Sequence, residues 1–248
     1  MKSMPRVLVS GPVRYAMFLA SLIAAWYLGY GIADAMISGS LRRSLTMIQK
    51  IGQKLQHRVP FPKQHKCGHW TACPSGSFAF LVLSGSENKK PPKICLEDEV
   101  LLGGEKNNYG RGMNIAIVEA KTGKYIRSGT FDLCEGASFI LLADNSGRMI
   151  EFLEKAPEGS LIFMATFDDS YSRMTEDAKK YIEGLGSKEI RKMAFRGNWV
   201  FVGTKGFTLP KDYEREKIIN CQKVKNKYSV WPSEIQILGC FSPKTDYL

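Results

Sequence analysis

Residues 67–73 hold the side chains of this 248-residue chain with the clearest capacity for chemistry. Cys67 and Cys73 are six positions apart, and His69 lies between them. Structural zinc sites normally use C-x-x-C pairs or paired histidines, and a thioredoxin-type redox site also needs C-x-x-C. Neither pattern is present, so the stretch favours disulfide bonds to distant partners. His69 is then expected to be a surface side chain and not a metal ligand.

The chain has six cysteines, all beyond the N-terminal region: Cys67, Cys73, Cys95, Cys134, Cys221 and Cys240. An even number of cysteines in an oxidising compartment predicts a disulfide framework. Many pairing schemes are compatible with six cysteines, so the residues alone leave the connectivity open.

A second group of polar residues suggests a binding rim. Asp168 and Asp169 follow an apolar stretch of strand length, where paired carboxylates can hold a metal ion or a sugar hydroxyl. A polar turn that caps the strand end is the alternative for this pair. Arg111 lies in the turn Asn107–Gly112, which we expect to aim its side chain. Together with Asn114, these residues form the rim that a lectin-like module would need.

Enzymatic chemistry is not predicted. The sequence has no G-x-S-x-G, H-E-x-x-H, Walker or G-x-G-x-x-G motif, and it has only three histidines for acid–base work. We therefore expect no catalytic site, no metal and no cofactor.

The first 35 residues predict a secretory signal. Three basic residues precede an apolar run, residues 15–33, and Ala33 and Ala35 form an A-x-A cleavage pattern. The alternative is an uncleaved membrane anchor, because the run is also long enough to span a bilayer. In both cases the remaining chain lies on the lumenal or extracellular side, so we expect a secreted protein.

The chain beyond residue 35 stays basic. Three of the 35 basic and one of the 24 acidic residues lie in 1–35, so an excess of nine positive charges remains. These basic residues are spread along the chain and form no RNP, helix-turn-helix or zinc-finger pattern. Nucleic acid is therefore not an expected partner.

Strands and helices are mixed without a regular βαβ order, which predicts an α+β fold. The pattern predicts strands at 78–84, 93–97, 113–119, 125–132, 161–167, 199–203 and 234–238, and helices at 149–155, 175–186 and 213–220. Thr175 is the expected N-cap of the second of these helices. A single domain is expected at 67–242, after a flexible lead-in at 36–66 and before a tail at 243–248. Within the lead-in, residues 41–55 have the spacing of a short amphipathic helix.

Six stretches resemble the secreted, cytokine-like family called "family with sequence similarity three". They are KCGHWTACPS, KICLED, GRGMNIAIVEAKTG, FMATFDDSYSRM, LGSKEIRKMAFRGNWVF and KYSVWPSEIQILGC, in this order over roughly residues 60–242. The resemblance implies a single globular β-β-α domain, the GG domain, with two packed antiparallel sheets flanked by helices. Related domains occur in a glycosyltransferase stem and in a hyaluronan-processing protein, which makes glycan binding an alternative to signalling.

The resemblance also implies two disulfides, Cys67–Cys95 and Cys73–Cys240. Cys134 and Cys221 lie outside this pattern. Cys134 precedes an insertion of mostly apolar residues, 137–143, that the family lacks, and we expect it to be buried. Cys221 is expected at the exposed end of a helix, where it is a candidate for an intermolecular disulfide or a small-thiol cap.

The function that the resemblance implies is that of a cytokine-like or hormone-like signal. It would regulate glucose metabolism, insulin secretion and islet cell survival through a cell-surface receptor. The expected partners are that receptor and, in the alternative, glycans. The expected state is a monomer or a weak or disulfide-linked dimer.

Overall fold

The computed structural model describes residues 11–56, 64–134, 144–211, 213–221 and 231–243. The chain divides into an N-terminal unit, Met1–Pro62, and a folded unit, Lys63–Leu248. The insertion at 137–143 and most of the C-terminal tail lie outside the described residues.

In its described part, the N-terminal unit is one long helix, α1 (Gly11–Gln56). Its segment Gly11–Met36 is apolar and long enough to cross a membrane, as an N-terminal signal sequence also is. Residues 37–56 are helical as well, so the predicted flexible lead-in is corrected over this part. The reason lies in the apolar spacing of three to four residues noted for 41–55 and in the absence of proline from residues 37–59.

The folded unit is built on nine strands in its described part: β1 (Phe78–Leu83), β2 (Lys93–Leu96), β3 (Glu99–Gly103), β4 (Gly112–Glu119), β5 (Tyr125–Phe131), β6 (Ser160–Phe167), β7 (Asn198–Lys205), β8 (Glu216–Ile219) and β9 (Gln236–Phe241). A four-stranded sheet has the order β3-β2-β1-β9, and a five-stranded sheet has the order β5-β4-β6-β7-β8. All of these pairings are antiparallel. The predicted α+β class with two antiparallel sheets is confirmed.

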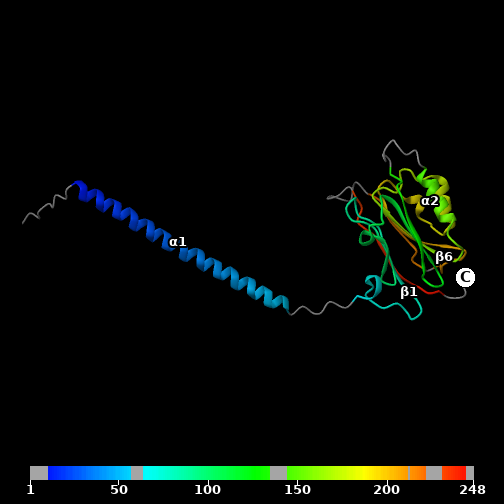
Figure 1. The fold of residues 1–248 in the computed structure, drawn as a ribbon, viewed down its shortest axis with the longest axis horizontal. Coiled ribbons are helices and arrows are strands. Elements are labelled where there is room, and N and C mark those ends of the chain that lie inside the picture. Colours follow the sequence, from blue (N-terminus) through cyan, green and yellow to red (C-terminus); the bar gives the residue numbers. More distant parts are fainter. Residues whose placement is uncertain (1–10, 57–63, 135–143, 212, 222–230, 244–248) are drawn as a thin grey trace, which may run out of the picture. The chain divides into compact units, whose positions relative to one another are not determined.

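Two α-helices complete the domain, α2 (Asn145–Glu154) and α3 (Glu176–Gly184), together with the 3₁₀ turns η1 (Lys66–Gly68), η2 (Gly104–Lys106) and η3 (Ile190–Lys192). The domain has three layers, because α2, α3 and η3 cover one face of the five-stranded sheet and the four-stranded sheet covers the other (Figure 1). On β4, Ala116 and Val118 pack toward the four-stranded sheet. Ile115 and Ile117 point to the other face and pack in the core that includes the helices.

Both α-helices of the folded unit begin at a capping side chain. Asp144 Oδ1 accepts a hydrogen bond from the Gly147 amide at 2.9 Å, and Thr175 Oγ1, the predicted N-cap, accepts one from the Ala178 amide at 3.3 Å. At the other end of α2, Lys205 Nζ donates to Glu154 O at 2.6 Å. A cation at the carboxyl end of a helix also suits the helix dipole.

The prediction of a helix at 213–220 is wrong. Residues Glu216–Ile219 form β8 instead, an edge strand that pairs antiparallel with β7. The local reason is the pair of β-branched residues Ile218 and Ile219, which favour a pleated surface. The tertiary reason is Glu216, whose carboxylate is held by groups far away in the sequence.

The two implied disulfides are present, with Cα–Cα distances of 5.8 Å for Cys67–Cys95 and 5.6 Å for Cys73–Cys240. The expectation that His69 is a surface side chain is wrong, because only 8% of the residue is exposed. Its Nε2 lies 3.0 Å from Phe80 O. This contact with a buried carbonyl of β1 satisfies a ring nitrogen of the buried imidazole.

Candidate functional site

Polar side chains gather where four strands of the five-stranded sheet end. The starts of β4 and β7 meet the ends of β5 and β6 here, since Gly112 pairs with Phe167 and Met113 with Phe131. The residues that we name the strand-end cluster are Arg111, Asp132, Asp168, Asp169 and Arg196. The other four lie close enough to Asp168 to affect the pKa of its carboxyl group.

Arg111 is held by Asp132. Its Nε lies 3.1 Å from both carboxylate oxygens, and its Nη2 lies 2.7 Å from Oδ2. This hydrogen-bonded pair raises the pKa of Arg111. Asp132 Oδ1 also accepts from the Cys134 amide at 3.0 Å. Sequence reasoning found Arg111 and missed Asp132, although a strand predicted to end there placed an acidic residue beside the same sheet edge.

Asn114 lies outside the rim that the sequence suggested, because it is fully buried. Its amide Nδ2 donates to Gly110 O at 2.8 Å, and its Oδ1 accepts from the Gly110 amide at 2.9 Å. Gly112, next in this turn, has φ +95°, and a Cβ there would lie 2.0 Å from Phe131 O. Asn114 and Gly112 thus fix the turn that carries Arg111.

Asp168 and Asp169 follow β6 and join the strand-end cluster. Burial raises the pKa of Asp168, against the opposing effect of Arg196 and Arg111. Asp169 is fully buried, and its Oδ1 accepts from the Tyr171 amide at 3.1 Å. Its Oδ2 has no hydrogen-bond partner among the described residues. This oxygen is enclosed, so Asp168 and not Asp169 is the carboxylate that a ligand can reach.

Arg196 is the second cation of the cluster, and sequence reasoning missed it. Its guanidinium carbon lies 4.8 Å from the ring centre of Phe195 and 4.2 Å from that of Trp231. Phe195 is 50% exposed, so an aromatic surface borders the charged group. No local pattern marks Arg196, because Asp168 and Trp231 are both distant in the sequence.

The chemistry of the strand-end cluster suits a neutral polar ligand. Two guanidinium groups supply hydrogen-bond donors, the partly exposed Asp168 supplies acceptors, and aromatic rings lie beside them. A cation is disfavoured because Asp132 is engaged by Arg111 and because both arginines repel positive charge. Sugars present both donors and acceptors, together with apolar ring faces.

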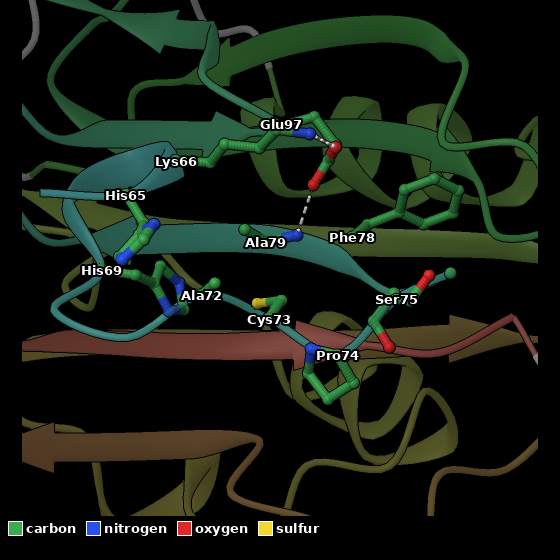
Figure 2. A pocket seen from close by; sticks show the side chains of 12 residues that line it. His65, Lys66, His69, Ala72, Cys73, Pro74, Ser75, Phe78, Ala79 and Glu97 are labelled. Carbon is green, nitrogen blue, oxygen red and sulfur yellow. Dashed lines mark hydrogen bonds and ion pairs between the residues drawn. The ribbon is translucent and has the colours of Figure 1, made fainter.

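A hollow of about 540 Å³ lies on the other side of the domain, beside η1 (Figure 2). We name it the N-terminal pocket; its lining includes His65, His69, Cys73, Phe78 and Glu97. Glu97 forms an ion pair with Lys66 and accepts from the Ala79 amide at 2.7 Å. Its carboxylate thereby ties the loop before β1 to the start of that strand.

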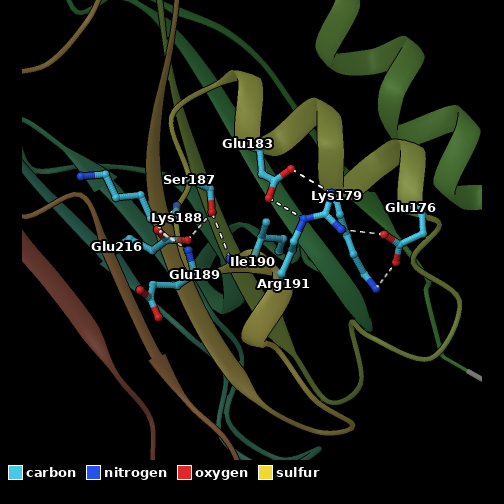
Figure 3. Close-up of polar contacts among 9 residues, drawn as sticks. All are labelled: Glu176, Lys179, Glu183, Ser187, Lys188, Glu189, Ile190, Arg191 and Glu216. Carbon is cyan, nitrogen blue, oxygen red and sulfur yellow. Dashed lines mark hydrogen bonds and ion pairs between the residues drawn. The ribbon is translucent and has the colours of Figure 1, made fainter.

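A polar network fastens β8 and η3 to the domain (Figure 3). The Glu216 carboxylate accepts from the Ser187 hydroxyl, from the Lys188 amide at 2.7 Å and from Trp199 Nε1 at 2.7 Å. On the adjoining surface Arg191 pairs with acidic residues of α3. These contacts stabilise the fold.

Cys134 and Cys221 take part in neither of the two disulfides. Both are partly exposed, so the expected contrast between a buried Cys134 and an exposed Cys221 is absent. Burial raises the pKa of the Cys134 thiol, and Arg111 opposes this effect. Cys221 follows a strand and not a helix. Its role in an intermolecular bond stays a prediction.

Comparison with known proteins connects this domain to a group of relatives. A family described as "Interleukin-like EMT inducer" matches residues 111–207, a stretch that contains the whole strand-end cluster. The chain is 43% identical to Protein FAM3B of Homo sapiens over 95% of this chain and 97% of that protein. It is 36% identical to Protein FAM3C of Rattus norvegicus, over 96% and 99%. It is 33% identical to Protein FAM3A of Homo sapiens, over 94% and 96%.

Proposed function

The chain belongs to the FAM3 family, and from this premise we propose that it is a secreted, cytokine-like signalling protein without enzymatic activity. It acts through a cell-surface receptor to regulate glucose metabolism, insulin secretion and islet cell survival. The observation that carries this proposal is the similarity along nearly the whole of both chains. An N-terminal apolar helix like a signal sequence and two disulfides also support it.

Secretion requires that α1 is cut. We expect the protein recovered from culture medium to begin at Met36, after the A-x-A pattern of Ala33 and Ala35. N-terminal sequencing of that protein checks this. Full-length chain found in membranes alone would contradict secretion and favour the uncleaved anchor.

The receptor is tested by binding to intact cells. Labelled protein should bind islet or liver cells saturably and be displaced by unlabelled protein, and cross-linking should capture one predominant surface protein. Protein with both disulfides reduced and alkylated is the control, because it has lost its fold. Saturable binding that disappears after enzymatic removal of cell-surface glycans would instead support a lectin.

A lectin-like module is the second candidate function. The specific observation behind it is the partly exposed Asp168 carboxylate near Arg111 and Arg196, with the exposed ring of Phe195 beside Arg196. On a glycan array, Arg196→Gln should abolish any sugar signal because it removes a donor at the site. Lys124→Gln is the matched control, since Lys124 lies in the turn after β4, at the opposite end of the same sheet. A signal equal in both variants would reject the strand-end cluster as a sugar site.

A further inference from the structure

The two disulfides differ in their access to solvent. Cys67 and Cys95 are 5% and 2% exposed, whereas Cys73 and Cys240 are both partly exposed. Cys73 also lines the N-terminal pocket. Exchange of a disulfide requires in-line attack by a thiolate, so access decides which bond opens first. The Cys73–Cys240 bond is therefore the exchangeable one.

His69 lies directly beside this bond. One ligand atom each of His69, Cys73 and Cys240 lies within 4.8 Å of the others. Figure 2 shows His69 and Cys73 along the same wall of the N-terminal pocket. Two sulfurs and one imidazole nitrogen are a ligand set that zinc accepts.

The imidazole is already oriented as in a metal ligand. A carbonyl oxygen can only accept, so the contact at 3.0 Å between His69 Nε2 and Phe80 O requires that Nε2 carries the proton. The lone pair of a neutral ring is then on Nδ1. Histidines that bind metals typically donate their other N–H to a backbone carbonyl or a carboxylate, which fixes the ring.

The distances also fit. Tetrahedral zinc with Zn–S of about 2.3 Å and Zn–N of about 2.0 Å places its ligand atoms about 3.5–3.8 Å apart. One ligand atom of each residue already lies within 4.8 Å of the others, which is near this spacing. Reduction lets the two sulfurs move apart to this spacing. The Cys67–Cys95 bond and the Lys66–Glu97 ion pair still hold the loop, and pairing with β1 holds β9.

We propose that opening the Cys73–Cys240 bond creates a Zn²⁺ site formed by Cys73, Cys240 and His69. A dithiol reductant supplies two electrons and two protons and is itself oxidised to a disulfide, which leaves two cysteine thiols. Zn²⁺ then displaces both thiol protons and binds the two thiolates and Nδ1. The fourth position faces the N-terminal pocket and takes water. The metal replaces the covalent link between this loop and β9.

The experiment uses the full-length chain in mild detergent under anaerobic conditions. A limiting amount of dithiol opens one disulfide, and alkylation mapping should locate the new thiols at Cys73 and Cys240. Titration with Co²⁺ as a spectroscopic probe should give one ion per chain, with the visible bands of tetrahedral cobalt and a thiolate charge-transfer band. Zn²⁺ should displace it, and Zn²⁺ should raise the Tm of the reduced protein.

Two variants make the test specific. His69→Gln keeps an amide donor for Phe80 O but lacks the imidazole. Its affinity for Co²⁺ should fall about 100-fold, because loss of a ligand should cost at least as much as loss of a residue that only supports a ligand. His65→Gln changes another histidine of the same pocket and should bind Co²⁺ like the original protein.

Four results would overturn the proposal. They are equal Co²⁺ affinity in His69→Gln and the original protein, Co²⁺ binding by the oxidised protein, prior opening of Cys67–Cys95, and loss of the near-ultraviolet circular dichroism of the fold before metal is added. The last result counts because the site needs the folded domain.

Discussion

The two outer faces of the domain are fastened in different ways. The outer face of the four-stranded sheet is covered by a loop over a small apolar cluster, Cys67, Leu81 and Cys95, and two disulfides leave this loop. The outer face of the five-stranded sheet is covered by α2, α3 and η3 over a large core that includes Trp199 and Phe201. Covalent bonds are used where the buried surface is small.

The free energies involved explain why the two faces are held differently. Ordering residues 64–77 costs roughly 1–2 kcal/mol of backbone entropy per residue, which exceeds 10 kcal/mol for the segment. A fully buried leucine contributes about 1.5–3 kcal/mol, so Leu81 and its neighbours cannot offset this cost. Disulfides lower the entropy of the unfolded chain and so reduce the deficit. The helical face has enough apolar surface to need no such bond.

The largest effect is expected for the longer disulfide. Replacing Cys73 and Cys240 together by alanine should lower the free energy of unfolding by about 5 kcal/mol, against about 3.5 kcal/mol for Cys67 and Cys95. The reason is loop length: Cys73 and Cys240 are 167 positions apart in the sequence, whereas Cys67 and Cys95 are 28 positions apart. Urea unfolding of both double variants measures the two losses. A greater loss for the shorter bond would show that packing around Cys67 and Cys95 outweighs loop closure.

The helical face should depend most on Glu216 among its polar groups. Glu216→Gln should cost about 2–3 kcal/mol, because a charged acceptor is removed from partly buried donors, including Trp199 Nε1. Chemical denaturation checks this. Glu189→Gln is the matched control, since Glu189 pairs with exposed Lys192 at 2.8 Å and should matter little. An equal loss of unfolding free energy in both variants would mean that the Glu216 carboxylate stabilises this face no more than a surface ion pair does.

What could be predicted from the sequence depends on whether a feature is determined within one segment or by contacts between distant segments. Strands such as β4 and β6 were predictable because a run of apolar residues within one segment indicates a buried strand. The disulfides were predictable from family resemblance, but not from spacing. The strand β8 was not predictable, because Glu216 acts through partners near residue 187 and at Trp199.

Site residues followed the same division. Arg111, Asp168 and Asp169 were found because a charged residue after a strand or in a turn is visible in one segment. Asn114 was assigned to the rim wrongly. The sequence does not show that its side-chain amide is buried and hydrogen-bonded to the backbone of Gly110. Arg196 was missed because its role comes from contacts between distant segments.

A small gain in stability is expected at the strand-end cluster. Burial raises the pKa of Asp168 in the folded protein, so the folded chain holds that proton more tightly than the unfolded chain does. Ionisation above this pKa therefore destabilises the fold, and Asp168→Asn should raise the Tm slightly at neutral pH. The gain should shrink as the pH falls toward the range where Asp168 is protonated. Thermal unfolding across pH measures it, and a lower Tm for the variant at neutral pH would contradict it.

The smallest effect is expected for Arg191, which lies on the same face as Glu216 but on its surface. Arg191 Nη1 lies 2.7 Å from Glu176, and its Nε lies 2.6 Å from Glu183. These two carboxylates raise the pKa of Arg191. All three side chains are at least 35% exposed, so solvent and salt screen the pairs.

Arg191→Gln should therefore lower the Tm less than Glu216→Gln does, and its effect should fade as salt is raised toward about 1 M, where the screening length is about 3 Å. The Glu216→Gln effect should persist in the same salt series, because its donors are partly buried and salt does not reach them. Thermal unfolding of both variants at low and high salt separates the two cases. An Arg191→Gln loss that equals that of Glu216→Gln, or that does not change with salt, would show that the surface pairs and the partly buried Glu216 carboxylate stabilise the helical face alike.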